Sequence, residues 1–262
     1  MSHTLRWLSL VALDRPLLPA FEDVAAWHAE HFPDDPQPAL AAATERLLTF
    51  TIGEFTAAAT LVDRPIPWAQ LEGPCATAWY WPRATAAMRD HRAHLLVALV
   101  DEGGSAVQKA AHLTRLTAAL TAAGPSLGAF WGPGRLVHDA EAFCEQAVQM
   151  ADDDLPLFLW IDFRIEKIDD PAMGEAVQLY TTGLEALGQS ELEAPRYAGS
   201  AQELLNHAYN LAHYLLDQRK LVRDGDTIGL TEEIQVTARR SPSMLGGELE
   251  VLRLEFERSE PD

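Results

Sequence analysis

The sequence is poor in cysteine and has no long apolar segment. Its 262 residues include two cysteines, Cys75 and Cys144, which are too few for the disulfide framework of a small secreted domain. No apolar run approaches the roughly 20 residues that a membrane-spanning helix needs. The segment Leu5–Leu13 lacks the basic start and the cleavage site of a signal peptide, so we expect it to be a strand. These absences favour a cytoplasmic protein.

Basic residues are also scarce. Lysine and arginine number 20 against 39 aspartates and glutamates, which gives a formal net charge of −19 at pH 7. Phosphate contacts need a basic surface, so we expect neither a nucleic acid nor an anionic membrane as a partner. The same surplus would speed association with a basic protein, although acidity also serves solubility alone.

The short motifs of the common enzyme classes are missing. The chain contains no phosphate-binding loop, no G-x-G-x-x-G, no G-x-S-x-G and no H-E-x-x-H. No set of residues completes a reaction centre. We therefore expect no cofactor and no catalytic residue.

What is present is a regular succession of strand and helix patterns. A chain of this length forms one large domain or two small ones, and it needs no metal or disulfide to complete its core. Residues 5–100 are predicted to form β-α-β-β-α-β and residues 128–256 β-α-β-β-α-β-β. This order indicates an α+β protein of two β-α-β-β-α-β-like halves, with antiparallel or mixed sheets and helices largely on one face. The predicted division is 1–104, a connecting helix at 105–125, and 126–262.

Some elements have clear local signals. Capping boxes begin both the connecting helix and a helix over Ser200–Asp217, and the second of these has leucine and alanine at helical spacing. Leu157–Glu166 alternates as a strand does. The last predicted strand, Leu249–Phe256, should turn Val251 outward.

Several segments of the chain together resemble one family. They are PIPWAQLE (Pro65–Glu72), HRAHLLVALV (His91–Val100), LWIDF (Leu159–Phe163), YTTGLEALGQSELE (Tyr180–Glu193), LAHYLL (Leu211–Leu216) and DGDTIG (Asp224–Gly229). In combination they resemble the bacterial DUF4261 family, a domain of unknown function, over nearly the whole chain.

The second half also resembles, more faintly, the suppressor-of-fused-like domain. A turn at Thr182–Leu184, an E-L-E strand at Glu191–Glu193, a helix and a G-D-T turn at Gly225–Thr227 follow in the same order. Members of that wider group are associated with binding other proteins, including as immunity proteins against secreted toxins. The resemblance implies a binding module and carries over no catalytic residue.

Acidic and aromatic side chains are the candidates for contact with a partner. They are Glu185, Glu191, Glu193, Asp152, Asp153, Asp154, Trp79 and Trp81. Large aromatics anchor interfaces when exposed and otherwise fill a core. Glu191 and Glu193 project to one side of a strand, so they could also serve acid–base chemistry or form a solvated face. Thr181–Gly183 could form a backbone nest for an anion, or a turn that needs positive φ at its glycine.

Histidine and cysteine provide the alternative sites. His91 and His94, beside Asp90, have the spacing of two metal ligands, but a helix end followed by a strand start explains them better. We therefore expect no metal and keep this pair as the alternative. Cys75 would be a nucleophile only if a helix N-terminus or a histidine lowered its pKa. A buried small side chain is the expectation for Cys75, and a place in the core for Cys144.

These observations favour a non-catalytic, acidic protein-binding module. It would act as an immunity or regulatory protein that occludes a basic toxin or effector. One alternative is a hydrolase that depends on a metal at His91 and His94 or on the carboxylates of Glu191 and Glu193. Another is a structural subunit of a homo-oligomer joined through an exposed sheet edge.

Overall fold

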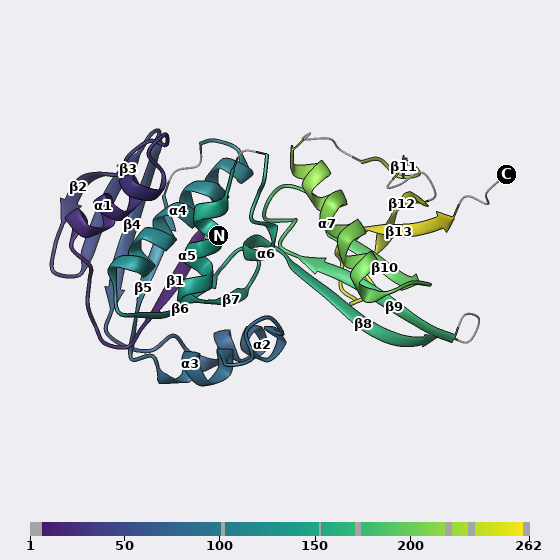
Figure 1. Ribbon diagram of the computed structural model, residues 1–262, viewed down its shortest axis with the longest axis horizontal. Coiled ribbons are helices and arrows are strands. Elements are labelled where there is room, and N and C mark those ends of the chain that lie inside the picture. The colour runs from purple at the N-terminus through teal and green to yellow at the C-terminus, as the bar shows by residue number, and fades with distance from the viewer. Residues whose placement is uncertain are drawn as a thin grey trace. The chain divides into compact units, whose positions relative to one another are not determined.

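Two sheets with associated helices make up the described chain (Figure 1). The computed structural model describes residues 7–100, 103–151, 153–170, 174–217, 222–229 and 234–258, apart from the side chains of Asp170 and Arg258. Contacts between residues divide the chain into two compact units, Met1–Trp160 and Ile161–Asp262. Helices and antiparallel or mixed sheets occur together, which confirms the α+β class.

The first unit contains a seven-stranded antiparallel sheet in the order β2-β3-β4-β5-β1-β6-β7. Its strands are β1 Leu8–Leu13, β2 Ala39–Ala43, β3 Leu47–Ile52, β4 Phe55–Val62, β5 Ala93–Leu99, β6 Ser126–Trp131 and β7 Leu136–Asp139. β1 and β5 are apolar runs that lie buried at the centre, as their sequences predict. Gly53, at φ 56°, turns β3 into β4 in a hairpin.

Helices cover both faces of this sheet. One face carries α1 (Phe21–His31), α4 (Ala106–Ala123) and α5 (Ala140–Gln149), and the other carries α2 (Trp68–Thr77) and α3 (Ala84–Asp90). Alternation along β1 separates the two layers. Leu10 and Ala12 join a core with Met88 of α3, whereas Ser9 Oγ lies 2.6 Å from Thr117 Oγ1 of α4. The expectation of helices largely on one face is therefore not met in this unit.

α4 belongs to the first unit and does not link two halves. Its predicted capping box is confirmed, because Gln108 N donates to Ser105 Oγ at 3.2 Å and Ser105 N donates to Gln108 Oε1 at 2.9 Å. More than half of its 18 residues are buried, and it packs on β1, β5 and β6. A helix with that much surface in one core is not a linker. The division therefore falls after Trp160 and not at residues 105–125.

The second unit contains a six-stranded mixed sheet in the order β11-β12-β13-β10-β9-β8. Its strands are β8 Asp162–Asp170, β9 Gly174–Thr182, β10 Leu192–Tyr197, β11 Thr227–Gly229, β12 Ile234–Pro242 and β13 Glu250–Arg258. β10 and β13 run parallel, with Leu192 opposite Leu252, and the other described neighbours are antiparallel.

The helix α7 (Ala201–Asp217) packs on β8 and β9. Ser200 N donates to Glu203 Oε2 at 2.8 Å and Glu203 N donates to Ser200 Oγ at 3.1 Å, so the predicted capping box is present. The apolar stripe is buried as predicted, at Leu204, Ala208, Leu211, Ala212, Leu215 and Leu216. Within the described ranges, no helix combines the length and the apolar character that crossing a membrane requires.

Other details differ from the sequence predictions. Leu157–Trp160 forms the short helix α6, and the strand begins at Asp162, because consecutive apolar residues do not distinguish a strand from a buried helical turn. Val251 is 1% exposed and its neighbour Leu252 is buried too, so both faces of β13 are covered there. The described order of the second unit is three strands, α7 and three strands, so the two units do not repeat one β-α-β-β-α-β pattern.

Candidate functional site

Glu191 closes a turn inside the second unit. Its side chain is 6% exposed. Oε2 accepts a hydrogen bond from Thr181 Oγ1 at 2.7 Å, and Oε1 accepts from the amides of Gly183 and Glu185 at 2.8 and 2.9 Å. Gly183 has the predicted positive φ, 126°, which glycine adopts readily. The turn alternative at Thr181–Gly183 is therefore the one observed, and its amides bond to the chain's own carboxylate.

The carboxylate of Glu193 is also hydrogen-bonded within its own unit. It is 1% exposed, and its carboxylate accepts from Ser243 Oγ at 2.5 Å and from Met244 N at 2.8 Å. These bonds fasten the connection between β12 and β13 to β10. Glu191 and Glu193 are therefore not on a surface that a partner can touch, which corrects their assignment as partner-binding residues.

Three of the remaining acidic candidates, Glu185, Asp153 and Asp154, are exposed. Glu185 lies in the turn after β9 of the second unit. Asp153 and Asp154 follow α5 in the first unit, where Ala151 and Asp154 form an isolated bridge. Asp152 lies outside the described residues. Asp153 and Asp154 belong to the first unit and Glu185 to the second.

The aromatic candidates lie between α2 and α3 and differ in exposure. Trp79 is 67% exposed and meets Tyr80 edge to face, with ring centroids 5.7 Å apart. Tyr80 is held in place, since its hydroxyl donates to Val137 O at 2.9 Å and its ring stacks on His138. Trp81 is half-buried against the core under α2 and α3. Trp79 thus has the exposure of an interface anchor, and Trp81 packs mainly within the unit.

The alternative metal pair is engaged by the backbone. His91 is 4% exposed; its Nδ1 donates to Met88 O at 2.5 Å, and its Nε2 accepts from Ile66 N at 2.7 Å. His94 Nδ1 donates to Arg64 O at 2.8 Å. Burial lowers the pKa of both rings. His91 has no nitrogen left for a metal ion, and the described residues contain no group of three or more His, Cys, Asp or Glu side chains placed to hold one.

The two thiols are shielded from ionisation. Cys75 is buried within α2, and Cys144 is half-buried in α5. Burial raises the pKa of both thiols to about 11. A thiol with such a pKa is a poor nucleophile at neutral pH.

A groove that no sequence motif marks lies on the face of the first unit that carries α1, α4 and α5. It has a volume of about 710 Å³ and is lined by Trp27 and His31 of α1, Thr121 and Ala122 of α4, and Ala140, Glu141, Cys144, Glu145, Val148 and Gln149 of α5. α4 therefore contributes its C-terminal end as the floor, between walls from α1 and α5. The Trp27 ring stacks on His31 at 4.2 Å, and Val148 is 38% exposed.

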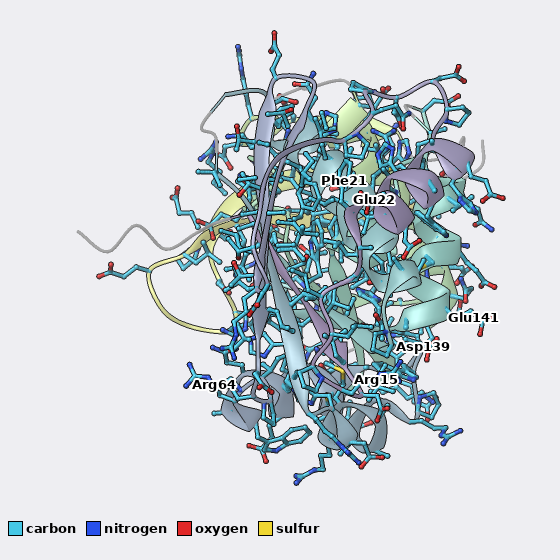
Figure 2. The ribbon with its side chains drawn as sticks, turned by 90° about the vertical axis from the view of Figure 1, so that its left-hand side faces the viewer. Arg15, Phe21, Glu22, Arg64, Asp139 and Glu141 are labelled. Carbon is cyan, nitrogen blue, oxygen red and sulfur yellow. The ribbon has the colours of Figure 1, made fainter. Side chains whose placement is uncertain are left out.

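The two helices on either side of this groove carry an excess of acidic side chains, and two of these, Glu141 and Glu145, line the groove. α1 and α5 contain five exposed carboxylates, Glu22, Asp23, Glu30, Glu141 and Glu145, and neither helix contains lysine or arginine. Figure 2 shows Glu22 and Glu141 on the side of the sheet that carries α1, α4 and α5. On α4, Arg115 is paired with Asp35 at 2.7 Å. The absence of lysine and arginine from α1 and α5 was the one signal in the sequence that pointed here.

The family model of a domain of unknown function (DUF4261) matches residues 180–255. This confirms the predicted resemblance for Tyr180–Glu193, Leu211–Leu216 and Asp224–Gly229, which all lie in the second unit. The match is shorter than the predicted one and does not include the segments before Tyr180. No curated protein and no solved structure matches the chain. None of these comparisons supports the resemblance to the suppressor-of-fused-like domain.

Proposed function

We propose that this protein is a non-catalytic module that binds a basic segment of another protein in the groove between α1, α4 and α5. One observation carries the proposal: a groove of about 710 Å³, lined by apolar side chains such as Trp27 and Val148 and by the carboxylates of Glu141 and Glu145, lies between two helices that hold five exposed carboxylates and no lysine or arginine. A surface of this kind complements an amphipathic segment with lysine or arginine beside its apolar face.

The two kinds of side chain would contribute differently. Trp27 and Val148 present apolar surface to a ligand in the groove, and contacts of this kind mainly slow dissociation. The carboxylates of Glu141 and Glu145 lie at its edge, where charge mainly speeds encounter and orients the ligand. Occupation of the groove would cover the basic surface of the partner, which is how an immunity or regulatory protein occludes a toxin or effector.

A binding role agrees with the observation that the candidate reactive groups are hydrogen-bonded within the protein. Glu191 and Glu193 accept hydrogen bonds from their own unit, and both ring nitrogens of His91 are bonded to backbone. These groups are the ones that the alternative hydrolase would have used. Cys75 and Cys144 are free thiols, which fits our proposal of a cytoplasmic protein.

The test uses a short labelled helical peptide of leucine and lysine and measures its fluorescence anisotropy. Wild-type protein is compared with E141Q/E145Q, which removes two carboxylates from the groove. We expect the Kd for the peptide to rise about tenfold at low salt and less at high salt, because exposed charges are screened.

The matched control is E54Q/E72Q, which removes two exposed carboxylates of the same unit outside the groove. It should change the Kd less than about twofold. Equal weakening by both double variants would mean that the peptide responds only to net charge, and the proposed site would be abandoned. If cross-linking recovers a native partner protein, that partner supports the proposed site only if E141Q/E145Q no longer captures it and E54Q/E72Q still does.

A further inference from the structure

We infer that the free edge of β2 pairs with β2 of a second copy of this chain, in antiparallel orientation, and so joins two seven-stranded sheets. A sheet edge offers unpaired N–H and C=O groups to any extended segment, and proteins usually protect such edges by shortness, charge or covering elements. The described sheets have four edges, β2 and β7 in the first unit and β8 and β11 in the second. Three of them are protected.

Each protected edge uses a different device. β7 is covered, since its first three residues are buried and the Tyr80 hydroxyl donates to Val137 O at 2.9 Å. β8 carries charges along most of its length, from Asp162 to Asp169. The described part of β11 is 3 residues long. These are the covering, charge and shortness that discourage pairing with another chain.

β2 has none of these three protections. All five residues of Ala39–Ala43 are exposed, and the strand contains no charged side chain. The next two strands, β3 and β4, contain no charged residue either. In a protein with a net charge of −19, two copies that meet along β2 bring no charged side chain of these three strands together, and the charges at this end of the sheet are those of Glu45, Arg46 and Glu54 in the connecting turns.

The strand is also complementary to itself. An antiparallel pair about Ala41 places Ala39 opposite Ala43 of the second copy, and Leu40 is the one side chain larger than alanine. Such pairing about a two-fold axis closes after two copies. A bulge between Leu40 and Ala42 is the one protective feature of this edge, and it limits the length of a regular ladder. We therefore expect a weak, concentration-dependent dimer.

Sedimentation equilibrium of the full chain tests this directly. Between about 5 and about 500 µM, the range in which a small interface associates, the average mass should rise from 28.8 kDa toward twice that value. A41K, which places a charge on the edge, should remain a monomer throughout the range. The matched control A86K makes the same charge change at an exposed position of α3 and should dimerise like the wild type.

Hydrogen exchange gives a second readout that needs no variant. In the wild type, amides of Ala39–Ala43 should exchange several-fold more slowly at the highest concentration than at the lowest. A constant mass of 28.8 kDa, or a dimer that A41K and A86K form equally, would refute the inference. The inference would also be refuted if the wild type stayed monomeric while its β2 edge paired with an added peptide. A41K leaves α1 and α5 intact, so failure here would leave the proposed groove untouched.

Discussion

The Ser243 hydroxyl donates a 2.5 Å hydrogen bond to the Glu193 carboxylate across a separation of 50 residues. Met244 N donates to the other oxygen of the same carboxylate at 2.8 Å. Bonds to a charged acceptor are stronger than bonds to a neutral one, and Glu193 is almost completely buried. Glu193 therefore links two distant segments inside the second unit, although the polar sequence around it suggests a position on the surface.

Replacement of Glu193 should be costly. In E193A, Ser243 Oγ and Met244 N lose a buried acceptor, and we expect the free energy of unfolding to fall by about 3 kcal/mol. Urea unfolding followed by circular dichroism measures it. E175A, at an exposed position of β9, should change it by less than about 0.5 kcal/mol. Similar losses in both variants would show that the Glu193 contacts do not stabilise the second unit.

Both thiols should react slowly with a thiol reagent. Their pKa is raised to about 11 from 9.0, so the thiolate fraction near pH 8 is about 100-fold below that of an unperturbed thiol. The rate with Ellman's reagent should be correspondingly low in native protein and should climb as pH rises. Guanidinium-unfolded protein is the control and should release both equivalents rapidly. Fast reaction of the native protein near pH 8 would contradict the assigned burial.

Stability of the first unit should depend on His138. Burial lowers the pKa of His138 to about 4, from 6.5, so protonation favours the unfolded chain. Its contribution is complete above pH 6.5 and is lost as the pH falls toward 4; between pH 7 and pH 5 the loss is about 2 kcal/mol. Urea unfolding at the two pH values measures it. Other buried histidines also titrate, so the informative quantity is the difference between wild type and H138Q. An unchanged pH dependence in H138Q would rule out the assignment.

Gly134 should not tolerate a side chain. A Cβ atom there would lie 2.3 Å from the carbonyl oxygen of Trp160, so the backbone would have to move. We expect G134A to lower the thermal midpoint, with a loss of about 2 kcal/mol or more in stability. G103A is the control, since nothing lies within 4 Å of its Cβ position, and it should be neutral or slightly stabilising. Calorimetry of the two variants should separate them clearly.

The parts of the fold that follow from local chemistry were predictable. The capping box at Ser200 and Glu203 and the leucine stripe that follows it specify α7 within one segment. β2 could not be predicted in this way. Ala39–Ala43 has no strand pattern, and alanine favours helices, so its conformation depends on pairing with β3. The assignment of α4 to the first unit likewise depends on tertiary packing.

The sequence predicted the acidic character of the candidate surface but not its position in the fold. An excess of carboxylates indicated a basic partner, yet the sequence cannot show that Glu191 and Glu193 are buried, because their donors Gly183 and Ser243 are brought to them only by the folded chain. The groove depends on α1 and α5 packing on either side of α4. Helices so distant along the chain give no joint signal in a single sequence.

β13 follows every other described strand in the chain, yet it lies inside its sheet, between β12 and β10. During synthesis, β10 consequently has no neighbour on that side until Glu250–Arg258 has left the ribosome. The first sheet already has all its strands once Asp139 has emerged. We expect the first unit to fold while translation continues and the second to fold in a single late step, since domains generally fold as units in the order of their synthesis.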